Sequence, residues 1–184
     1  MTVKTTVGKG TNSNKEKILS NIQNLDNSQI WHVLNLSLKT MRTYYALENK
    51  GIRIDCDSNK AEFDGCALIA LYTAEEYLKR SGKKDKNIDA LFGKFNTNSE
   101  GVFEINESME NIFKGISKIE KEIYPEKGYS GVNLQPKSWE SFSLNTGKEL
   151  IELITDPKGY ETKRKAARDF QITQAIDYLN GNTR

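Results

Sequence analysis

Apolar residues recur every three or four positions along most of the chain, which is the period of an α-helix. The first predicted helix covers residues 14–25 and the second covers residues 28–50. We expect Ser28 to cap the start of the second helix and Gly51 to end it in the C′ position. The chain therefore opens with two helices joined by a short connection.

The next segment shows a different period. Residues 52–56, IRIDC, alternate between apolar and polar, which is typical of a short strand, and residues 58–63 could return as its partner. The stretch FDGCALIALYTAEEYLKR, residues 63–80, then reads as an apolar helix with Cys66 near its start. A small hairpin followed by a buried helix is the expectation here.

A short helix is predicted around residues 88–95, followed by a loop over 96–101. The clearest periodicity comes next, with apolar residues spaced alternately four and three apart up to Pro125. This seam has two interpretations, which stay open: it faces the core of its own domain, or it binds a partner helix. Its members are Ile105, Met109, Ile112, Ile116, Ile119 and Ile123.

The end of the chain starts with an irregular segment, 128–145, rich in turn-forming residues. A short amphipathic helix and then a last helix over 161–181 follow it. The apolar positions of the last helix are Ala166, Ala167, Phe170, Thr173, Ile176, Tyr178 and Leu179.

These patterns predict a mainly α protein, a compact multi-helix domain of about six to eight helices with at most a small β-hairpin. Residues 1–13 contain almost no apolar side chains, and we expect them to form a flexible polar N-terminal arm. Residues 14–184 are expected to form a single helical domain.

Composition narrows the class of protein. The 184 residues include 27 basic and 25 acidic side chains, so the net charge of +2 gives no strong basic excess. The two cysteines do not form a disulfide framework, the first residues have no apolar signal-peptide core, and the longest apolar run is too short to cross a bilayer. We expect a soluble, cytoplasmic protein in a reducing compartment, without a membrane partner.

The strongest candidate for catalysis is Cys66, because a helix N-terminus can stabilise a thiolate. His32 is the single histidine and Asp55 lies between the two, so the chain order is histidine, acid, cysteine. This order, with DGC opening an apolar helix, resembles that of SUMO-deconjugating and adenovirus-type cysteine proteases. The resemblance implies a cysteine-dependent hydrolase or transferase. Ala67 stands where that family has a glycine.

A second interpretation of Cys66 is structural, because free cysteine is among the most buried residue types and this helix is apolar on both sides of it. One histidine and two cysteines without a CxxC pair exclude a His/Cys zinc site, and the sequence predicts no cofactor and no metal centre.

Basic residues near the start of the last helix are a candidate site for phosphate contacts. Cations are disfavoured at a helix N-terminus by the helix dipole, so their position suggests a role in binding. The predicted nucleic-acid-binding residues are Lys158, Tyr160, Lys163, Arg164, Lys165 and Arg168.

No set of residues makes a convincing active site, so the sequence favours a non-enzymatic binding protein that acts through helical surfaces. Two forms remain open: an adaptor or inhibitor that docks on another protein, and a nucleic-acid-associated protein that assembles with its own copies, as in packaging. The cysteine-dependent enzyme with Cys66 and His32 is the alternative from a different class.

Overall fold

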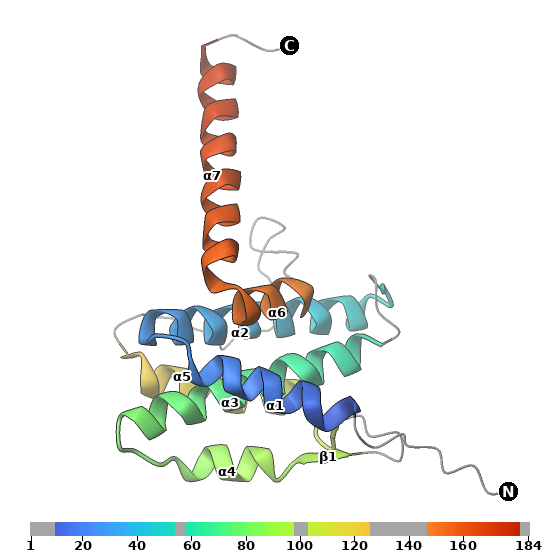
Figure 1. The fold of residues 1–184 in the computed structure, drawn as a ribbon. Coiled ribbons are helices and arrows are strands. Elements are labelled where there is room, and N and C mark those ends of the chain that lie inside the picture. Colours follow the sequence, from blue (N-terminus) through green and yellow to red (C-terminus); the bar gives the residue numbers. More distant parts are fainter. Residues whose placement is uncertain (1–9, 54–57, 98–102, 126–146, 181–184) are drawn as a thin grey trace, which may run out of the picture.

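The computed structural model describes residues 10–53, 58–97, 103–125 and 147–180. These ranges contain seven helices and one two-stranded antiparallel hairpin, which confirms the predicted mainly helical fold (Figure 1). The irregular segment 128–145 and most of the predicted N-terminal arm lie outside the described residues. The first helix starts at Gly10, within the range assigned to that arm.

The elements follow one another in the order α1 (Gly10–Gln23), α2 (Asn27–Asn49), α3 (Asn59–Arg80), α4 (Lys86–Phe92), β1 (Phe95–Thr97), β2 (Phe103–Ile105), α5 (Met109–Ile123), α6 (Gly147–Thr155) and α7 (Pro157–Leu179). In the hairpin, Phe95 pairs with Ile105.

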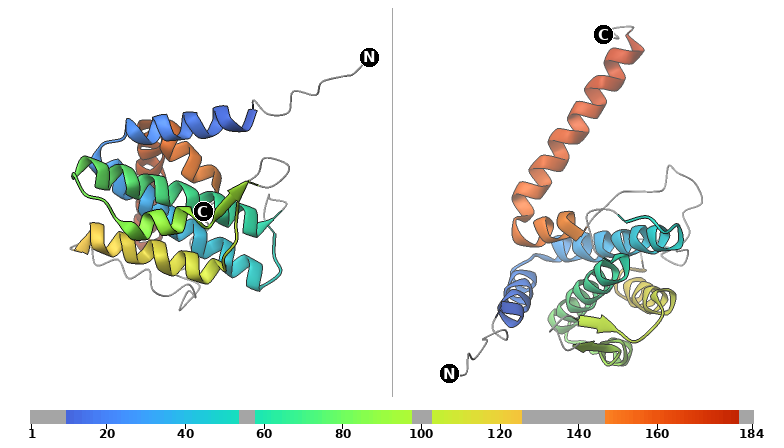
Figure 2. Two further views of the ribbon diagram at one scale, coloured as in Figure 1. Left: turned by 90° about the horizontal axis from the view of Figure 1, so that it is seen from below. Right: turned by 90° about the vertical axis from the view of Figure 1, so that its right-hand side faces the viewer.

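An antiparallel pair of long helices, α2 and α3, forms the centre of the molecule (Figure 1). Three fully buried alanines of α3, Ala67, Ala70 and Ala74, leave room for a close approach of the neighbouring helices. Helix α6 packs on α2 on the side from which α7 projects, and α4, α5 and the hairpin lie away from α7 (Figures 1 and 2). The core therefore lies around α2 and α3, and α7 is outside it.

Buried hydroxyl groups in the central pair are satisfied within their own helices. Ser37 donates to the carbonyl of Val33 at 2.7 Å, and Thr73 donates to that of Ile69 at 2.7 Å. Thr40 makes the same contact with Leu36 at 2.8 Å. Because each hydroxyl bonds the carbonyl four residues before it, these polar residues are buried without an unpaired donor.

The start of α2 corrects one prediction. Asp26, rather than Ser28, is the N-cap: its carboxylate accepts from the backbone N–H of Gln29 at 2.8 Å, and the Gln29 side chain accepts from the N–H of Asp26 at 3.0 Å. This reciprocal capping box satisfies two helix-terminal donors, which Ser28 cannot do. Gly51 follows the C-cap with a φ of 64°, as predicted for the residue that ends α2.

The hairpin lies elsewhere than predicted. Residues 59–63, expected as a returning strand, form the first turns of α3, with Ser58 as N-cap. The side chain of Asn59 donates to the carbonyl of Ile52 at 2.7 Å and holds the α2–α3 connection together. The observed hairpin pairs residues 95–97 with residues 103–105. Phe95, predicted as helical, and Asn96 and Thr97, predicted as loop residues, are therefore in a strand.

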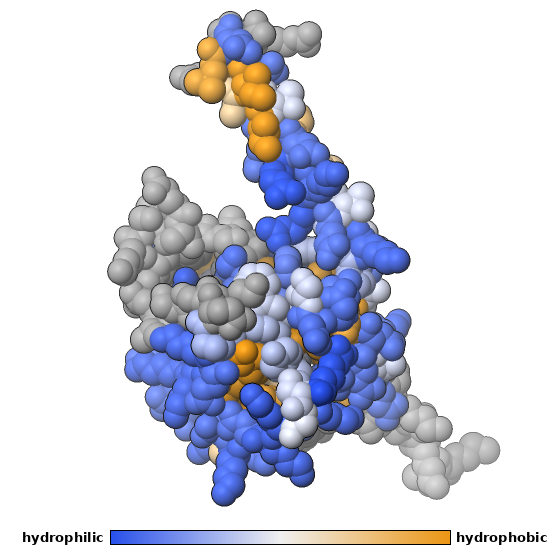
Figure 3. Space-filling view, turned by 90° about the vertical axis from the view of Figure 1, so that its left-hand side faces the viewer, coloured by the Kyte–Doolittle hydropathy of each residue, from blue (hydrophilic) through white to orange (hydrophobic). Residues whose placement is uncertain are grey.

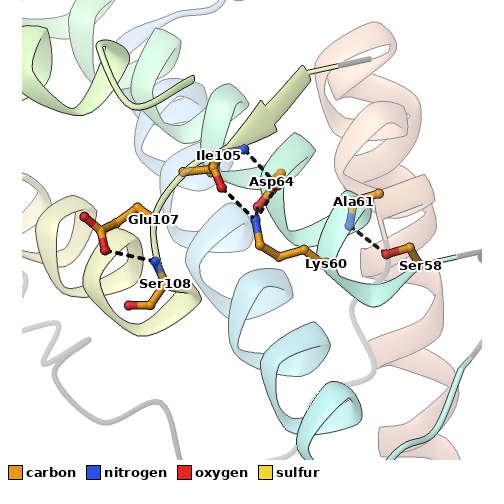
Figure 4. Close-up of polar contacts among 7 residues, drawn as sticks. All are labelled: Ser58, Lys60, Ala61, Asp64, Ile105, Glu107 and Ser108. Atoms are coloured by element: carbon orange, nitrogen blue, oxygen red, sulfur yellow. Dashed lines mark hydrogen bonds and ion pairs between the residues drawn. The ribbon is translucent and has the colours of Figure 1, made fainter. Parts of the chain in front are cut away.

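A partly buried ion pair attaches this hairpin to α3 (Figure 4). The Asp64 carboxylate accepts the backbone N–H of Ile105 at 3.1 Å and contacts the Lys60 ammonium at 2.5 and 2.6 Å. Lys60 also donates to the carbonyl of Ile105 at 3.3 Å. Burial raises the pKa of Asp64, and the hydrogen bonds from Lys60 and Ile105 oppose that rise.

The predicted helical seam belongs to the core. Ile105 is not part of the helix but the last residue of β2, and α5 starts at Met109. The four isoleucines on α5 and Ile105 are buried, and Met109 is partly buried against them. The seam therefore faces the core of its own domain, which was one of its two interpretations, and offers no surface to a partner.

Candidate interaction surface on helix α7

Helix α7 starts at a sharp corner after α6. Asp156 is the single residue between the two helices, and Pro157 occupies the first turn of α7, where a missing N–H costs no hydrogen bond. The Asp156 carboxylate accepts the N–H of Gly159 at 3.0 Å. A Cβ atom on Gly159 would lie 2.0 Å from the Asp156 Oδ2 atom, so a side chain there would displace this cap. The corner directs α7 away from the body of the molecule (Figure 1).

The base of α7 is fixed to the body by side chains of its first turns. Tyr160 is buried against the core. The Arg164 guanidinium carbon lies 5.8 Å from the centre of the Tyr160 ring, and Lys163 forms an ion pair with Glu152 of α6. These contacts hold the direction in which the rest of the helix projects.

A polar cleft of about 400 Å³ lies at this base, between α2, α6 and α7. Burial lowers the pKa of Lys39, and the neighbouring charges of Arg164 and Arg42 lower it further. Burial raises the pKa of Glu149 on α6, while Arg164 opposes that rise. Cations and carboxylates are thus mixed in the cleft, so it does not present a uniformly positive surface.

Beyond its base, α7 is exposed on every side. All of its side chains from Glu161 to Asp177 are exposed, and so is Leu179 (Figures 1 and 2). Exposed fractions are 63% for Phe170, 51% for Ile172, 50% for Ile176 and 81% for Leu179. Figure 3 shows apolar surface gathered on the far half of this helix. Large apolar side chains exposed together mark an interaction site more often than an inert surface.

The exposed apolar residues lie on two different faces of α7. Ile172, Ile176 and Leu179 follow one another at spacings of four and three residues and form one stripe, which we call the isoleucine face. Phe170 is two residues, or about 200°, from Ile172 around the helix, and so lies on the opposite side. We call that side, with Ala166, Ala167 and Thr173, the phenylalanine face.

The structure places the predicted nucleic-acid-binding residues on the first half of α7. Five of the six are exposed: Lys158, Lys163, Arg164, Lys165 and Arg168. Tyr160 is buried, so its ring is not available to stack on a base. The apolar positions predicted for this helix are exposed where they are described, because α7 leaves the body after its first turn.

The proposed catalytic residues are not brought together. Cys66 lies seven residues after the start of α3, is 2% exposed, and burial raises the pKa of its thiol. His32 lines the cleft at the base of α7, whereas Cys66 lies in a different groove, beside α6. Asp55 lies outside the described residues.

Neither a metal centre nor a membrane span is found in the described part of the chain. No group of three or more histidine, cysteine, aspartate or glutamate side chains there is arranged to hold a metal ion. None of the described helices is both long and apolar enough to cross a bilayer.

Sequence reasoning missed the residues of the body that receive α7, namely Lys39, Glu149 and Glu152. One signal could have pointed to Lys39. Within residues 27–41 it is the only residue among the lysines, arginines, aspartates and glutamates.

Comparison with protein-family models, curated proteins and solved structures found no match to this chain. Its function is therefore inferred from its own geometry and chemistry.

Proposed function

We propose that this chain is a non-enzymatic binding protein that docks on another protein through α7. The observation that carries the proposal is the exposure of Ile172, Ile176 and Leu179 on a helix that projects from a packed body. Apolar anchors at positions i, i+4 and i+7 are the pattern with which a helix fills a hydrophobic groove of a partner.

The physical state of α7 supports the same conclusion. An isolated helix of this length is only marginally stable in water, because most helix stability in proteins comes from packing of one face. Past its first turns, none of the described side chains of α7 is buried in the core. Binding in a groove would supply the missing packing, and it would bury the isoleucine face.

The charges favour a protein partner over nucleic acid. Glu161 and Asp169 lie among the cations of α7, and Lys163 is already paired with Glu152. Strong phosphate binding needs several cations free of such competition. Lys165 and Arg168 lie on the same side of the helix as the isoleucine face, where they would form the polar rim of a protein interface.

Site-specific photocrosslinking in the cells that make the protein tests this proposal. The photoreactive residue p-benzoylphenylalanine replaces Ile172 or Ile176, and the control variant carries it at Lys118, an exposed position on α5. We expect a discrete protein adduct with the first two variants and none with the Lys118 variant, because only the isoleucine face is buried in the complex.

Three outcomes would contradict the proposal. The absence of an adduct at both isoleucines would mean that this face is not a docking surface in the cell. Equal labelling at Lys118 would mean that the adducts are non-specific. An adduct sensitive to nuclease rather than protease would favour the nucleic-acid-associated form of the protein.

A further inference from the structure

We propose that the phenylalanine face of α7 pairs with the same face of a second copy of this chain, in an antiparallel arrangement centred on Phe170. Phe170 is 63% exposed, and its face is separate from the one that carries the proposed function. The inference therefore goes beyond that function and does not depend on it.

The first reason is charge. Residues on this face are spaced alternately three and four apart, as in a two-helix seam, and run from Lys163 through Ala166, Phe170 and Thr173 to Asp177. Lys163 lies seven residues before Phe170 and Asp177 seven residues after it. An antiparallel pair centred on Phe170 thus places each Lys163, which already contacts Glu152 of its own α6, beside Asp177 of the second copy as well. A parallel pair would place like charges together at both positions.

The second reason is packing. In the antiparallel pair the two Phe170 rings meet on the two-fold axis, and Ala167 of each copy lies opposite Thr173 of the other. Small residues beside a large one allow two helices to approach closely enough for the ring to be buried. Such a self-complementary surface is the requirement for a two-fold symmetric dimer.

The third reason is the length of the projecting part. The unbroken run of exposed residues in α7 begins at Glu161, after the buried Tyr160, and the helix ends at Leu179. Phe170 is the midpoint of that range. With a two-fold axis at Phe170, the projecting segments of the two copies therefore lie side by side along their whole length. In this arrangement the end of each helix lies at the base of the other, and the two bodies lie at opposite ends of the pair.

Size-exclusion chromatography with light scattering, followed by disulfide crosslinking of the purified full chain, tests the pairing. We expect a dimer whose dissociation constant rises at least about tenfold in Phe170→Glu, because a central aromatic anchor contributes much of an interface's energy. Asp177→Lys should weaken the dimer several-fold, and Lys163→Asp combined with Asp177→Lys should recover part of the loss. Circular dichroism confirms that each variant stays folded.

Crosslinking fixes the direction of the pair. In a Cys56→Ser background, Phe170→Cys should form a disulfide between copies on oxidation, because the two introduced thiols lie on the two-fold axis. Thr173→Cys should not, since an antiparallel pair separates the two introduced thiols by about 9 Å along the helix axis. A parallel pair would crosslink both variants.

A monomer at all concentrations, a dimer unaffected by Phe170→Glu, or crosslinking of both cysteine variants would each overturn the inference. None of these results bears on the isoleucine face. An adduct at Ile172 together with a monomeric chain would leave the proposed function intact and remove only the dimer.

Discussion

Glu120 shows at the scale of one residue how burial without a partner changes a side chain's chemistry. It lies on the inner side of α5 with no exposed surface, and neither carboxylate oxygen has a hydrogen-bond partner among the residues that the structure describes. Burial raises its pKa to about 7, and the charge of Lys121 only partly opposes the rise. The folded protein therefore holds a proton on this carboxyl group at a pH where the unfolded chain has released it.

This shift predicts a pH dependence of stability. Because the folded-state pKa lies above the unfolded value, the favourable contribution of the protonated group is complete below about pH 4.3 and is lost as the pH rises toward about 7. Glu120→Gln removes the titrating group, so we expect the variant to gain stability relative to the native chain across that range, reaching roughly 3.5 kcal/mol at pH 8. Urea unfolding at several pH values measures the difference.

Glu122→Gln, at an exposed position on the same helix, is the matched control. Its stability curve should run parallel to that of the native chain. A parallel curve for Glu120→Gln as well would show that Glu120 does not titrate differently in the folded and unfolded states.

At the scale of one element, a carboxylate from another element helps to hold the β1–β2 hairpin. Two three-residue strands are too short to be stable alone, and Asp64 of α3 supplies both an acceptor for the Ile105 N–H and a partner for Lys60. We therefore expect Asp64→Ala to cost about 3 kcal/mol, since a buried donor and a cation lose their partner together.

The Asp64→Asn variant separates the contribution of the hydrogen bond to Ile105 from that of the ion pair with Lys60. Its side-chain oxygen can still accept from Ile105, so we expect a smaller loss of stability and continued protection of the Ile105 amide from hydrogen exchange. In Asp64→Ala that amide should exchange rapidly. If both variants exchange equally fast, the ion pair with Lys60 rather than the hydrogen bond to Ile105 holds the hairpin.

At the scale of the whole molecule, the base of α7 belongs to the body and the rest of the helix does not. Tyr160 is 7% exposed and Phe170 is 63% exposed, although both are aromatic residues of the same helix. We expect Tyr160→Ala to lower the free energy of unfolding by about 2–3 kcal/mol, because it removes a buried ring. Phe170→Ala should change it by less than about 0.5 kcal/mol in the monomer, where the ring contacts little.

Thermal or urea unfolding at a concentration that keeps the chain monomeric measures both variants. Equal losses would mean that α7 folds back on the body in solution. No loss with Tyr160→Ala would mean that the base of the helix is not fixed there, and the direction of the projecting part would then be undetermined.

The sequence by itself determined the helical class, because the apolar period is a property of each segment alone. It also determined the end of α2 at Gly51, where the backbone needs a positive φ. It misplaced the hairpin. Residues 52–56 alternate as a strand does, and residues 58–63 were expected to pair with them, but Ser58 caps a helix that starts at Asn59. The sequence pattern also assigned Ile105 to the same helix as Met109, whereas Ile105 ends β2 and the helix α5 begins at Met109.

Only the tertiary structure decided which apolar faces are covered. The seam on α5 and the apolar positions of α7 are both apolar patterns in the sequence, yet one is buried and the other is exposed. The physical reason is the corner at Asp156 and Gly159, which turns α7 away from the core. Periodicity shows that a helix has an apolar face; the path of the chain in space decides whether its own domain or a partner covers that face.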